Sequence, residues 1–562
     1  MLIGIDVGGT FTDGVVFKQD HISGWAKEAT DDTNLALSLL KVLDNLLLDV
    51  DVKQIKRVVL STTLVTNLIV TDSGPRTALI LLPGSGLPFE SYKLAPDTFF
   101  LSGSMDFRGN EIKPLDINEV INIIEQIKAL GINRVAIAAK FGNRNKSHEL
   151  LIRDLFNEKY PQAKVTISSQ ITQQLNFPRR AFTAYLTSRT IDKWNYFIDN
   201  MQQAITERQI IAPIHILKAD GGTIPLEASR ENPCETIFSG PAASTMGGLA
   251  LTRNEVKNSV VLDIGGTTTD ISLIIAGQPL YASKGAKINE KYTHIKSFAV
   301  RSIALGGDSI LWLNNGSLQI GPDRIGPAAC FGGEMATVTD AFNVLYDLQL
   351  GSVSQSQEKL TVLTSLLKTP LSEFCQMVVN VTLERLKAEV FTMFKEWEQE
   401  PAYKVWEIVN RKSFHLDRII GIGAASAAII PILAADMKID YLIHDYSPIA
   451  NALGSAVSRP TLTVNLHADT QANLYTVEPG GIQGKLSKNN GMQLDDAKKL
   501  ARQHLESLAL SRGLESYAHE AQFLLEEQFN VIRGWDRLGK IYEVGIQITP
   551  GFIDEFKEVV KL

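Results

Sequence analysis

The sequence has few cysteines, and its basic residues do not gather into runs. Three cysteines stand far apart in 562 residues, without a CxxC pair. This spacing predicts neither a disulfide framework nor a zinc site, and the nine histidines show no metal-ligand clustering. The formal net charge is −7, and there is no run of Lys or Arg. The chain is therefore not expected to bind nucleic acid.

Long apolar runs are also missing. The longest one, residues 424–435, contains Ser426 and Pro431 and is too short to cross a bilayer. The first predicted strand starts directly after Met1, which leaves no room for a signal peptide. With 44% hydrophobic and 21% charged residues, the composition is typical of a globular protein. We expect a cytoplasmic protein without a membrane partner, built from two to four domains.

The most informative feature that is present is a motif that occurs twice. DVGGTFTD at residues 6–13 returns as DIGGTTTD at residues 263–270. Each copy follows an apolar run and precedes another, which is the pattern of a strand, a tight glycine turn and a second strand. We therefore predict two β-hairpins that grip one polyphosphate from opposite sides. A polar turn would explain one copy, but two copies in matching contexts favour an ATP clamp.

The residue types of the repeated motif suit a nucleotide with a divalent cation. Glycines let backbone N–H groups approach phosphate oxygens, and threonine hydroxyls add donors. Asp6 and Asp263 end apolar strands, where a carboxylate can hold Mg²⁺ directly or through water. Asp13 or Asp270 could orient the attacking water, although closing the turn is an equally good role. The predicted ATP contacts of the hairpins are Gly8, Gly9, Thr10, Thr12, Gly265, Gly266, Thr267 and Thr268.

Two further glycine pairs are candidate nucleotide contacts. Gly306 and Gly307 precede a predicted short helix, whose N-terminus would suit a phosphate or adenosine; a simple helix start capped by Asp308 is the alternative. Gly421 and Gly423 lie at a strand-to-helix junction that could hold the adenosine end. That junction is an imperfect Rossmann fingerprint, and a Walker A loop is absent from the sequence. The nucleotide argument therefore depends on the hairpins.

Alternating strand and helix patterns over residues 1–169 predict an α/β lobe. The sequence pattern changes after residue 460, and we interpret residues 461–562 as a small α+β domain. This domain is predicted to contain a helix at 495–510 and strands near 522–532 and 540–548. Apolar runs predict strands at residues 58–60, 78–82, 135–139 and 165–167, and helical spacing predicts helices at 34–48, 117–130, 147–158, 178–202 and 371–410.

As a set, the motifs resemble those of the hydantoinase A/5-oxoprolinase family of the actin-like ATPase superfamily. The resemblance covers roughly residues 1–460. It is carried by GIDVGGTFTD (4–13), STTLVTN (61–67), NKSHE (145–149), NFPRRA (176–181), SGPAAS (239–244), VTDA (338–341) and ANALG (450–454).

The resemblance implies a fold and an activity. The expected fold is α/β, an actin-like (ribonuclease H-like) duplicated two-lobe ATPase with a small C-terminal α+β domain. The expected division is 1–175, 176–460 and 461–562. The implied cofactors are ATP and Mg²⁺, and the implied reaction is ATP-driven opening of a cyclic amide such as a hydantoin or 5-oxoproline. Members commonly work with a B-type subunit, related members energise carboxylation of ketones, and a homo-oligomer is a further expectation.

The segment at residues 61–67 is the predicted substrate contact. It follows a buried strand and starts a helix, so Thr63 and Asn67, four residues apart, share a face, and Thr62 lies beside them. Capping of the helix by Ser61 or Thr62 is the alternative. Arg180 is predicted to pair with a substrate carboxylate or phosphate, with a salt bridge at the lobe interface as the alternative.

The leading hypothesis is attack of the amide carbonyl oxygen on the γ-phosphate, followed by ring opening by water. Asp6, Asp263 and Asp13 are the predicted catalytic residues, with charge neutralisation around the phosphoryl group as the main requirement. A small-molecule kinase with Asp308 as base and an ATP-driven reactivation factor for a partner enzyme are the alternatives. Asp340 is predicted to cap a helix that starts at residue 341, without a catalytic role.

Overall fold

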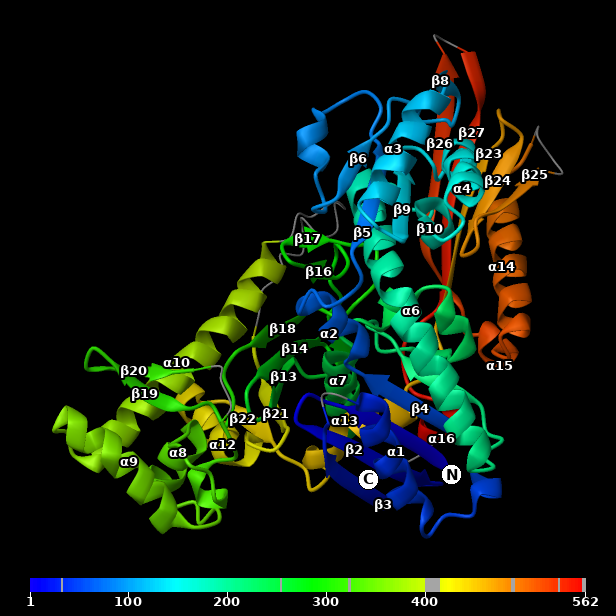
Figure 1. The fold of residues 1–562 in the computed structure, drawn as a ribbon. Helices are drawn as coiled ribbons and strands as arrows, with labels where there is room; N and C mark the ends of the chain where they lie inside the picture. The colour runs from blue at the N-terminus through cyan, green and yellow to red at the C-terminus, as the bar shows by residue number, and fades with distance from the viewer. Residues whose placement is uncertain are drawn as a thin grey trace.

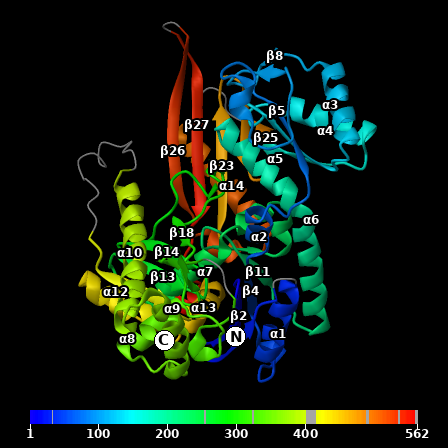
Figure 2. The same cartoon turned by 60° about the vertical axis from the view of Figure 1, so that its left-hand side comes forward.

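The computed structural model describes residues 1–31, 34–252, 255–321, 325–399, 415–486, 491–533 and 536–557. Four sheets of four to six strands, with helices packed on them, make up most of this part (Figure 1). Turned by 60°, the molecule shows a long hairpin of the chain's last two strands standing beside the central strands of its sheet (Figure 2). None of the helices in the described ranges combines the length and the apolar character needed to cross a membrane.

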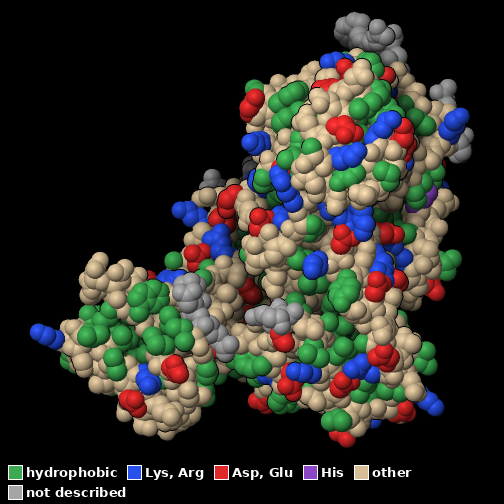
Figure 3. All heavy atoms as spheres, in the orientation of Figure 1, with side chains coloured by type: hydrophobic (Ala, Val, Ile, Leu, Met, Phe, Trp, Pro, Cys, Tyr) green, Lys and Arg blue, Asp and Glu red, His purple; other side chains and the backbone are tan. Residues whose placement is uncertain are grey.

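The surface carries charges of both signs. On the face shown in Figure 3, acidic and basic side chains are interspersed over the whole outline, without a large field of one sign. Such a mixture is typical of a globular protein in water.

The first sheet has the N-terminal strand in its interior. β1 pairs antiparallel with β2 and parallel with β4, and all six β1 residues are buried. α1 (Leu35–Leu47) buries one apolar face against the sheet. The strands in spatial order are β12 (Thr223–Pro225), β11 (Ile214–Leu217), β4 (Arg57–Thr62), β1 (Leu2–Val7), β2 (Phe11–Lys18) and β3 (His21–Ala29).

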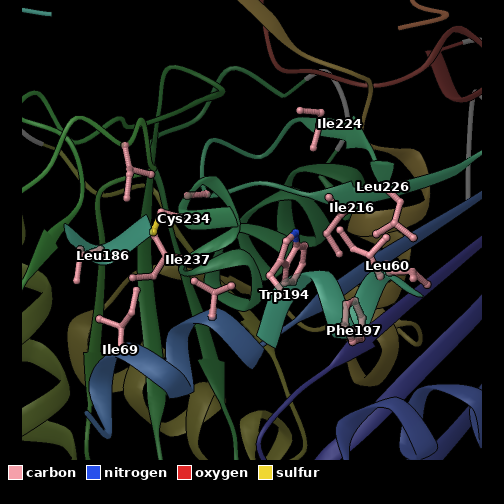
Figure 4. Close-up of a cluster of buried hydrophobic side chains, with 14 of the residues drawn as sticks. Leu60, Ile69, Leu186, Trp194, Phe197, Ile216, Ile224, Leu226, Cys234 and Ile237 are labelled. Atoms are coloured by element: carbon pink, nitrogen blue, oxygen red, sulfur yellow. The ribbon is translucent and has the colours of Figure 1, made fainter. Parts of the chain in front are cut away.

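The long helix α6 (Phe177–Glu207) forms the core with the first sheet. Figure 4 shows Trp194 and Phe197 of this helix among Leu60 and Ile216, which come from the neighbouring strands β4 and β11. Trp194 is completely buried, and its indole N–H donates to Ser229 Oγ at 2.9 Å. Because a buried indole needs a partner for its N–H, this bond allows the largest apolar side chain of the cluster to lie inside.

The second sheet is parallel and lies in the upper part of Figure 1. α3 (Ile117–Ala129) and α4 (Ser147–Lys159) pack against it, as the helical spacing predicts. A two-stranded ribbon of β7 (Ser104–Met105) and β8 (Glu111–Lys113) follows one edge strand along the chain. The sheet consists of β10 (Lys164–Ile167), β9 (Arg134–Ala139), β5 (Thr77–Leu82) and β6 (Thr98–Phe100).

The third sheet repeats the local pairing of the first. Its interior strand β13 pairs antiparallel with β14 and parallel with β21, as β1 does with β2 and β4. The predicted helix at 371–410 is observed as α10 (Leu371–Glu398), and residues 400–414 lie outside the described ranges. The strands are β15 (Gln278–Pro279), β14 (Thr269–Ile275), β13 (Ser259–Ile264), β21 (Arg418–Ile422), β22 (Asp440–Leu442) and β18 (Val300–Ile303), which pairs with β14.

Two small-residue helices link the first and third sheets. α7 (Ser239–Leu251) packs against α13 (Ala450–Val457) at very short range. A Cβ on Gly247 would lie 2.2 Å from the Ala450 carbonyl oxygen, and one on Gly454 would lie 2.4 Å from that of Ala243. α7 contacts strands of both sheets, while α13 contacts strands of the first. The glycines therefore allow a close packing that couples the two sheets.

The C-terminal sheet lies beside the second sheet. α14 (Leu494–Ser511) buries a row of Ala and Leu side chains against it, and the helix and the last two strands agree with the predicted ones. The first three strands of this sheet were not predicted individually. The division into 1–175, 176–460 and 461–562 stays a prediction. The sheet consists of β25 (Ile482–Lys485), β24 (Leu474–Glu478), β23 (Leu462–Asp469), β27 (Asp536–Ile548) and β26 (Gln522–Arg533).

The remaining elements are short or cover the third sheet. They are α2 (Leu64–Val70), α5 (Ser168–Ile171), α8 (Val338–Tyr346), α9 (Val353–Leu367), α12 (Ser426–Met437), α15 (Glu515–Ala518), α16 (Asp554–Lys557), and the strands β16 (Lys287–Ile288), β17 (Lys291–Tyr292), β19 (Leu311–Asn314) and β20 (Ser317–Ile320).

Two local predictions are wrong. Gly306 and Gly307 do not lead into a helix but lie in a loop between β18 and β19. The Gly307 N–H donates to the Gly265 carbonyl, and the Gly307 carbonyl accepts from the Thr339 N–H, so this backbone bonds to distant segments instead of to a helical turn. α8 starts at Val338, with Thr337 as N-cap. Asp340 is the third residue of this helix, where its carboxylate completes a capping box with Thr337.

Candidate functional site

The two repeated motifs form two hairpins with the same geometry. In the first, Asp6 of β1 lies opposite Asp13 of β2, and the Gly8 N–H donates to the Phe11 carbonyl at 3.0 Å. In the second, Asp263 lies opposite Asp270, and the Gly265 N–H makes the corresponding 3.0 Å bond. The predicted hairpins are confirmed. The remaining predicted contacts of the turns, all exposed or partly exposed, are Gly9, Thr10, Gly266, Thr267 and Thr268.

The carboxylates of the two hairpins lie within electrostatic reach of one another. Burial is the main cause of a raised pKa at Asp6, Asp13 and Asp270, and the negative charge of Asp263 raises the pKa of all three. A charge exerts this effect only over a short distance in a partly buried site. The two hairpins therefore turn their acidic residues toward a common region, although they are far apart in the sequence.

Asp6 is the most enclosed member of this cluster. Its side chain is 2% exposed, and Oδ1 has no hydrogen-bond partner among the described residues. Burial raises its pKa to about 7, the charges of Asp13 and Asp263 add to the shift, and the side chains of Ser61 and Asn451 oppose it. An unpaired buried carboxylate oxygen is costly, so it indicates a position prepared for a cation.

Asp263 is held by neutral donors from the two linking helices. The Ser244 hydroxyl of α7 donates to Asp263 Oδ2 at 2.5 Å, and the Asn451 amide of α13 donates to the same oxygen at 2.9 Å. Asn451 thus lies between Asp263 and Asp6. Sequence reasoning assigned it no role, although it is a lone amide in the small-residue segment ANALG.

Asp13 is tied to a cation within its own sheet. Lys27 Nζ of β3 lies 2.5 Å from Asp13 Oδ1 and 4.9 Å from the centre of the Phe11 ring. Burial raises the pKa of Asp13, and the neighbouring Lys27 opposes this. Its role in positioning water stays a prediction.

Thr12 helps to stabilise the first turn. Its side chain is buried, and its hydroxyl lies 3.0 Å from that of Thr30, which donates to the Gly8 carbonyl at 2.9 Å. These contacts hold the glycine turn in place, while contact of Thr12 with a ligand stays a prediction.

The other predicted glycines surround the second hairpin. The Gly307 and Asp308 N–H groups donate to the carbonyls of Gly265 and Gly266 at 2.9 and 2.6 Å. A Cβ on Gly306 would lie 2.5 Å from the backbone of Gly266. The structure therefore brings this loop directly onto the turn, which requires the absence of a side chain at Gly306.

The β21–α12 junction packs against Asp263 itself. Gly423 has a φ of +83°, and a Cβ there would lie 2.4 Å from Asp263 Oδ1. Gly421 lies inside β21, where a Cβ would approach Ile430 of α12 at 2.8 Å. Gly423 is thus a neighbour of the acidic cluster, while Gly421 serves the packing of strand and helix.

The predicted substrate segment lies at the carboxyl end of β4. Thr63 is the N-cap of α2, and its hydroxyl is buried without a hydrogen-bond partner among the described residues. Asn67 is exposed one turn later. The Thr62 hydroxyl accepts from the Leu64 N–H at 3.2 Å, but the N-cap position belongs to Thr63 and not, as the capping alternative had it, to Ser61 or Thr62. The register places Ser61 beside Asp6, so this segment borders the cluster.

Arg180 lies inside the protein. Its guanidinium is completely buried and donates to the carbonyls of Ala139, Lys140 and Gln174 and to the Ser168 hydroxyl. Burial lowers its pKa to about 10. Through these hydrogen bonds to neutral groups, Arg180 ties the end of β9 to α6, and no ion pair of Arg180 is seen within the described ranges. A substrate contact of Arg180 stays a prediction.

The donor set fits a hard divalent cation that a nucleotide also ligates. Within the described ranges no group of three His, Cys, Asp or Glu side chains is arranged as a complete metal site. Mg²⁺ does not require one, since it is commonly bound through one or two carboxylates, waters and phosphates. The unpaired Oδ1 of Asp6 and the nearby Asp263 meet that need.

Family models match most of the chain. The model described as Hydantoinase/oxoprolinase matches residues 180–464, and the model of the Hydantoinase/oxoprolinase N-terminal region matches residues 2–160. The two matches contain the two hairpins.

Individual relatives are distant. The chain is 25% identical to caprolactamase subunit alpha of Pseudomonas jessenii over 60% of its own length, and it spans about half (53%) of that relative. It is 21% identical to the acetophenone carboxylase gamma subunit of Aromatoleum aromaticum, covering 99% of this chain and 81% of that protein. The solved nucleotide-free structure of acetone carboxylase shares the fold, with a TM-score of 0.72, 18% identity, and coverage of 98% and 87%.

Proposed function

The chain belongs to the hydantoinase/oxoprolinase family, and from this premise we propose that it is an ATP-dependent enzyme that opens a cyclic amide. The observation that carries the proposal is the pair of acidic glycine hairpins whose carboxylates share one electrostatic environment. In this proposal the two hairpins belong to the two lobes of an actin-like fold, and the triphosphate of ATP lies between them. Backbone N–H groups of their glycines are the phosphate donors.

Asp6 and Asp263 are the proposed ligands of Mg²⁺. When bound, the cation would neutralise charge on the phosphates. Asn451 and Ser244 hold Asp263 in place through neutral hydrogen bonds. The negative charge of the Asp263 carboxylate is therefore not neutralised by these partners and can attract the cation. Burial raises the pKa of Asp6 to about 7, and a bound cation would favour the ionised form of this carboxyl.

The reaction we propose transfers the γ-phosphoryl group to the amide carbonyl oxygen and releases ADP. Water then adds to the activated carbon and the C–N bond breaks, which leaves an acyl phosphate on the opened chain. A second water hydrolyses this acyl phosphate to the free acid and inorganic phosphate. In this reaction the protein positions the reactants and neutralises the charge on the transferring phosphoryl group. Thr63 and Asn67 are the proposed contacts to the ring, because Thr63 has an unsatisfied buried hydroxyl beside the cluster.

A second candidate is the nucleotide-binding subunit of a carboxylase. It is supported by the match to the acetophenone carboxylase gamma subunit over nearly the whole chain. Because both relatives are named as subunits, we propose that a second, B-type subunit takes part in either case. Bicarbonate distinguishes the two: a carboxylase needs it for turnover with a ketone, and a lactam hydrolase does not.

The test is ATP hydrolysis by the purified chain, with and without a co-expressed B-type subunit, in the presence of hydantoin, 5-oxoproline or caprolactam. We expect ring-opened acid and inorganic phosphate in equal amounts. Asp6→Asn and Asp263→Asn should each lower kcat by about a hundred-fold or more. Asp20→Asn, at an exposed position outside the cluster, is the matched control. Full activity of either cluster variant would contradict the assigned roles.

A further inference from the structure

The C-terminal sheet ends in a long strand, β26, that pairs with the rest of the described chain along one edge only. β26 has twelve residues and is the terminal strand of its sheet, with β27 along its inner edge. Figure 2 shows the hairpin of these two strands standing beside β23. Within the described ranges no strand pairs with the outer edge of β26. Because the outward N–H and C=O groups of an edge strand are unpaired, such a strand can accept a further strand.

β26 lacks several features that commonly protect an edge strand. Its twelve residues include no Pro and no Lys, and its two register shifts lie near its ends, so residues 525–531 pair regularly with β27. Every residue from 524 to 530 is exposed. Leu525 and Phe529 are 38% and 51% exposed. A long edge that presents apolar side chains to solvent is typical of a strand that pairs with a partner.

One row of side chains across this sheet has two neighbouring carboxylates. Glu527 of β26 lies directly opposite Glu543 of β27, and Glu543 lies opposite His467 of β23. Opposite residues of antiparallel strands project on the same face, where like charges are unfavourable. Arg144 and His467 both contact Glu543, whereas Glu527 forms no ion pair within the described part of the chain. A basic side chain on an added strand would lie beside Glu527 and offset this repulsion.

The rows on either side of Glu527 are apolar. Leu525 lies opposite Gly545, which has no side chain, and Phe529 lies opposite Ile541 of β27. Leu525, Glu527 and Phe529 are alternate residues of a regular strand, so their side chains share one face. On this face the edge presents an apolar, an acidic and an apolar side chain in succession.

The other face of β26 is already engaged by the chain itself. Glu526 pairs with Lys498 of α14 at 2.6 Å. Tyr542 and Val544, which lie beside this face on β27, are buried in the core that α14 forms with the sheet. Selective recognition of a partner is therefore expected on the face of Glu527.

We propose that β26 is a docking edge for an extended segment of a partner subunit, which pairs with it as a further strand. The segment has the pattern apolar–x–basic–x–apolar, with Lys or Arg beside Glu527 and apolar side chains beside Leu525 and Phe529. Backbone hydrogen bonds supply affinity, and the alternate side chains supply selectivity. β26 itself lacks this pattern, so a second copy of the strand does not complement it. That the partner is the B-type subunit rests on the proposed function.

Photo-crosslinking in the complex tests the position of the docking edge. The chain with Phe529→benzoylphenylalanine is co-expressed with the B-type subunit, and the crosslinked peptide is identified by mass spectrometry. We expect a crosslink to a segment of the B-type subunit with the pattern apolar–x–basic–x–apolar. Leu510→benzoylphenylalanine, at an exposed position of α14 in the same domain, is the matched control and should give no such crosslink.

Charge reversal tests the basic residue of the partner. Glu527→Lys should weaken the complex by about ten-fold or more, because it places like charges side by side. The difference from the wild type should become smaller at high salt, which screens exposed charges. Glu506→Lys, exposed on α14, is the matched control and should leave the affinity unchanged. Circular dichroism and the unfolding temperature check that each variant is folded.

The outcomes separate the docking edge from the proposed function. A complex without a crosslink from position 529, or with unchanged affinity after Glu527→Lys, overturns the docking edge and keeps the B-type subunit. A crosslink to a second copy of this chain, or no complex at all, also overturns the docking edge, and lactam turnover then decides the proposed function by itself. The expected crosslink together with no ATP-dependent lactam opening supports the docking edge and contradicts the proposed function.

Discussion

At the scale of single residues, the site is governed by the cost of burying carboxylates. Removing an ionised carboxylate from water is unfavourable, so burial favours the protonated form unless a cation is near. Asp13 has Lys27 at 2.5 Å, whereas no cation acts on Asp6, and burial together with the charges of Asp13 and Asp263 raises its pKa to about 7. Burial and the charge of Asp263 raise the pKa of Asp270 to about 7 as well. Two of the four carboxyls therefore titrate close to physiological pH.

These pKa values predict how stability depends on pH. Between pH 4 and 7 the folded protein keeps protons on Asp6 and Asp270 that the unfolded chain has lost. The stabilisation is complete below the pKa of the unfolded state and is lost as the pH rises toward 7. Without nucleotide, we expect the free energy of unfolding to fall over this range by up to about 1.4 kcal/mol per pH unit for each carboxyl. Urea unfolding at several pH values measures this.

An Asp6→Asn/Asp270→Asn double variant is the comparison for the pH experiment. It should show a flatter profile between pH 4 and 7, because the two titrating carboxyls are gone. Mg·ATP should raise the stability of the wild type most at pH 7 and above, since the cation favours ionised carboxylates. Identical slopes for wild type and double variant would show that these residues do not titrate as inferred.

At the scale of elements, the glycine loops determine how closely the backbone approaches the acidic cluster. Gly423 combines a left-handed φ of +83° with a contact that leaves no room for a methyl group beside Asp263. Gly306 is packed just as closely against the second turn, but its φ is not in the left-handed region. Small residues here are therefore required by shape as well as by conformation.

We expect Gly423→Ala to damage nucleotide binding more than stability. The strained φ should cost about 1–3 kcal/mol of unfolding free energy, and the new Cβ should displace Asp263. Gly316→Ala is the matched control, because Gly316 has a φ of +74° and open space where its Cβ would point. Gly423→Ala should lose more stability than Gly316→Ala, because its Cβ also meets Asp263 and the Ile264 backbone, and only Gly423→Ala should lose affinity for a fluorescent ATP analogue. Equal affinities would mean that the junction does not position Asp263.

At the scale of the whole molecule, ion pairs connect the C-terminal sheet to the second sheet's helices and loops. Arg108 pairs with Asp469 at 2.8 Å. Arg144 pairs with Glu543 at 2.9 Å, and His467 lies 2.7 Å from the same Glu543 oxygen. A cavity of about 450 Å³ is lined by residues of β10 in the second sheet and of β23 and β24 in the C-terminal sheet.

Removing Arg144 should loosen this connection. Arg144→Met leaves the partly buried Glu543 with His467 alone, and we expect a loss of about 1–3 kcal/mol of unfolding free energy. Limited proteolysis should then cut more readily in residues 461–562. Arg153→Met, which breaks an exposed pair on α4, is the control and should have little effect. Equal proteolysis rates for the two variants would contradict a docking role for Arg144.

The sequence by itself determined the two hairpins and their acid–glycine chemistry. A tight turn between two apolar strands needs glycine within a few residues, so the pattern can be read locally in both copies of the motif. Apolar runs predicted β5, β9 and β10 of the second sheet, and helical spacing predicted α3 and α4, while the short edge strand β6 was not predicted. The helix expected after Gly307 was not found, because that backbone bonds to the turn at Gly265 and Gly266, which is distant in the sequence.

Only the tertiary structure decided which distant residues meet. It placed the Asn451 amide between the two halves of the cluster and enclosed the Arg180 guanidinium among carbonyls. Each of these depends on contacts between segments far apart in the chain. The identity of a side chain shows what it can bind, but burial and neighbours, which packing alone creates, decide whether it is free to do so.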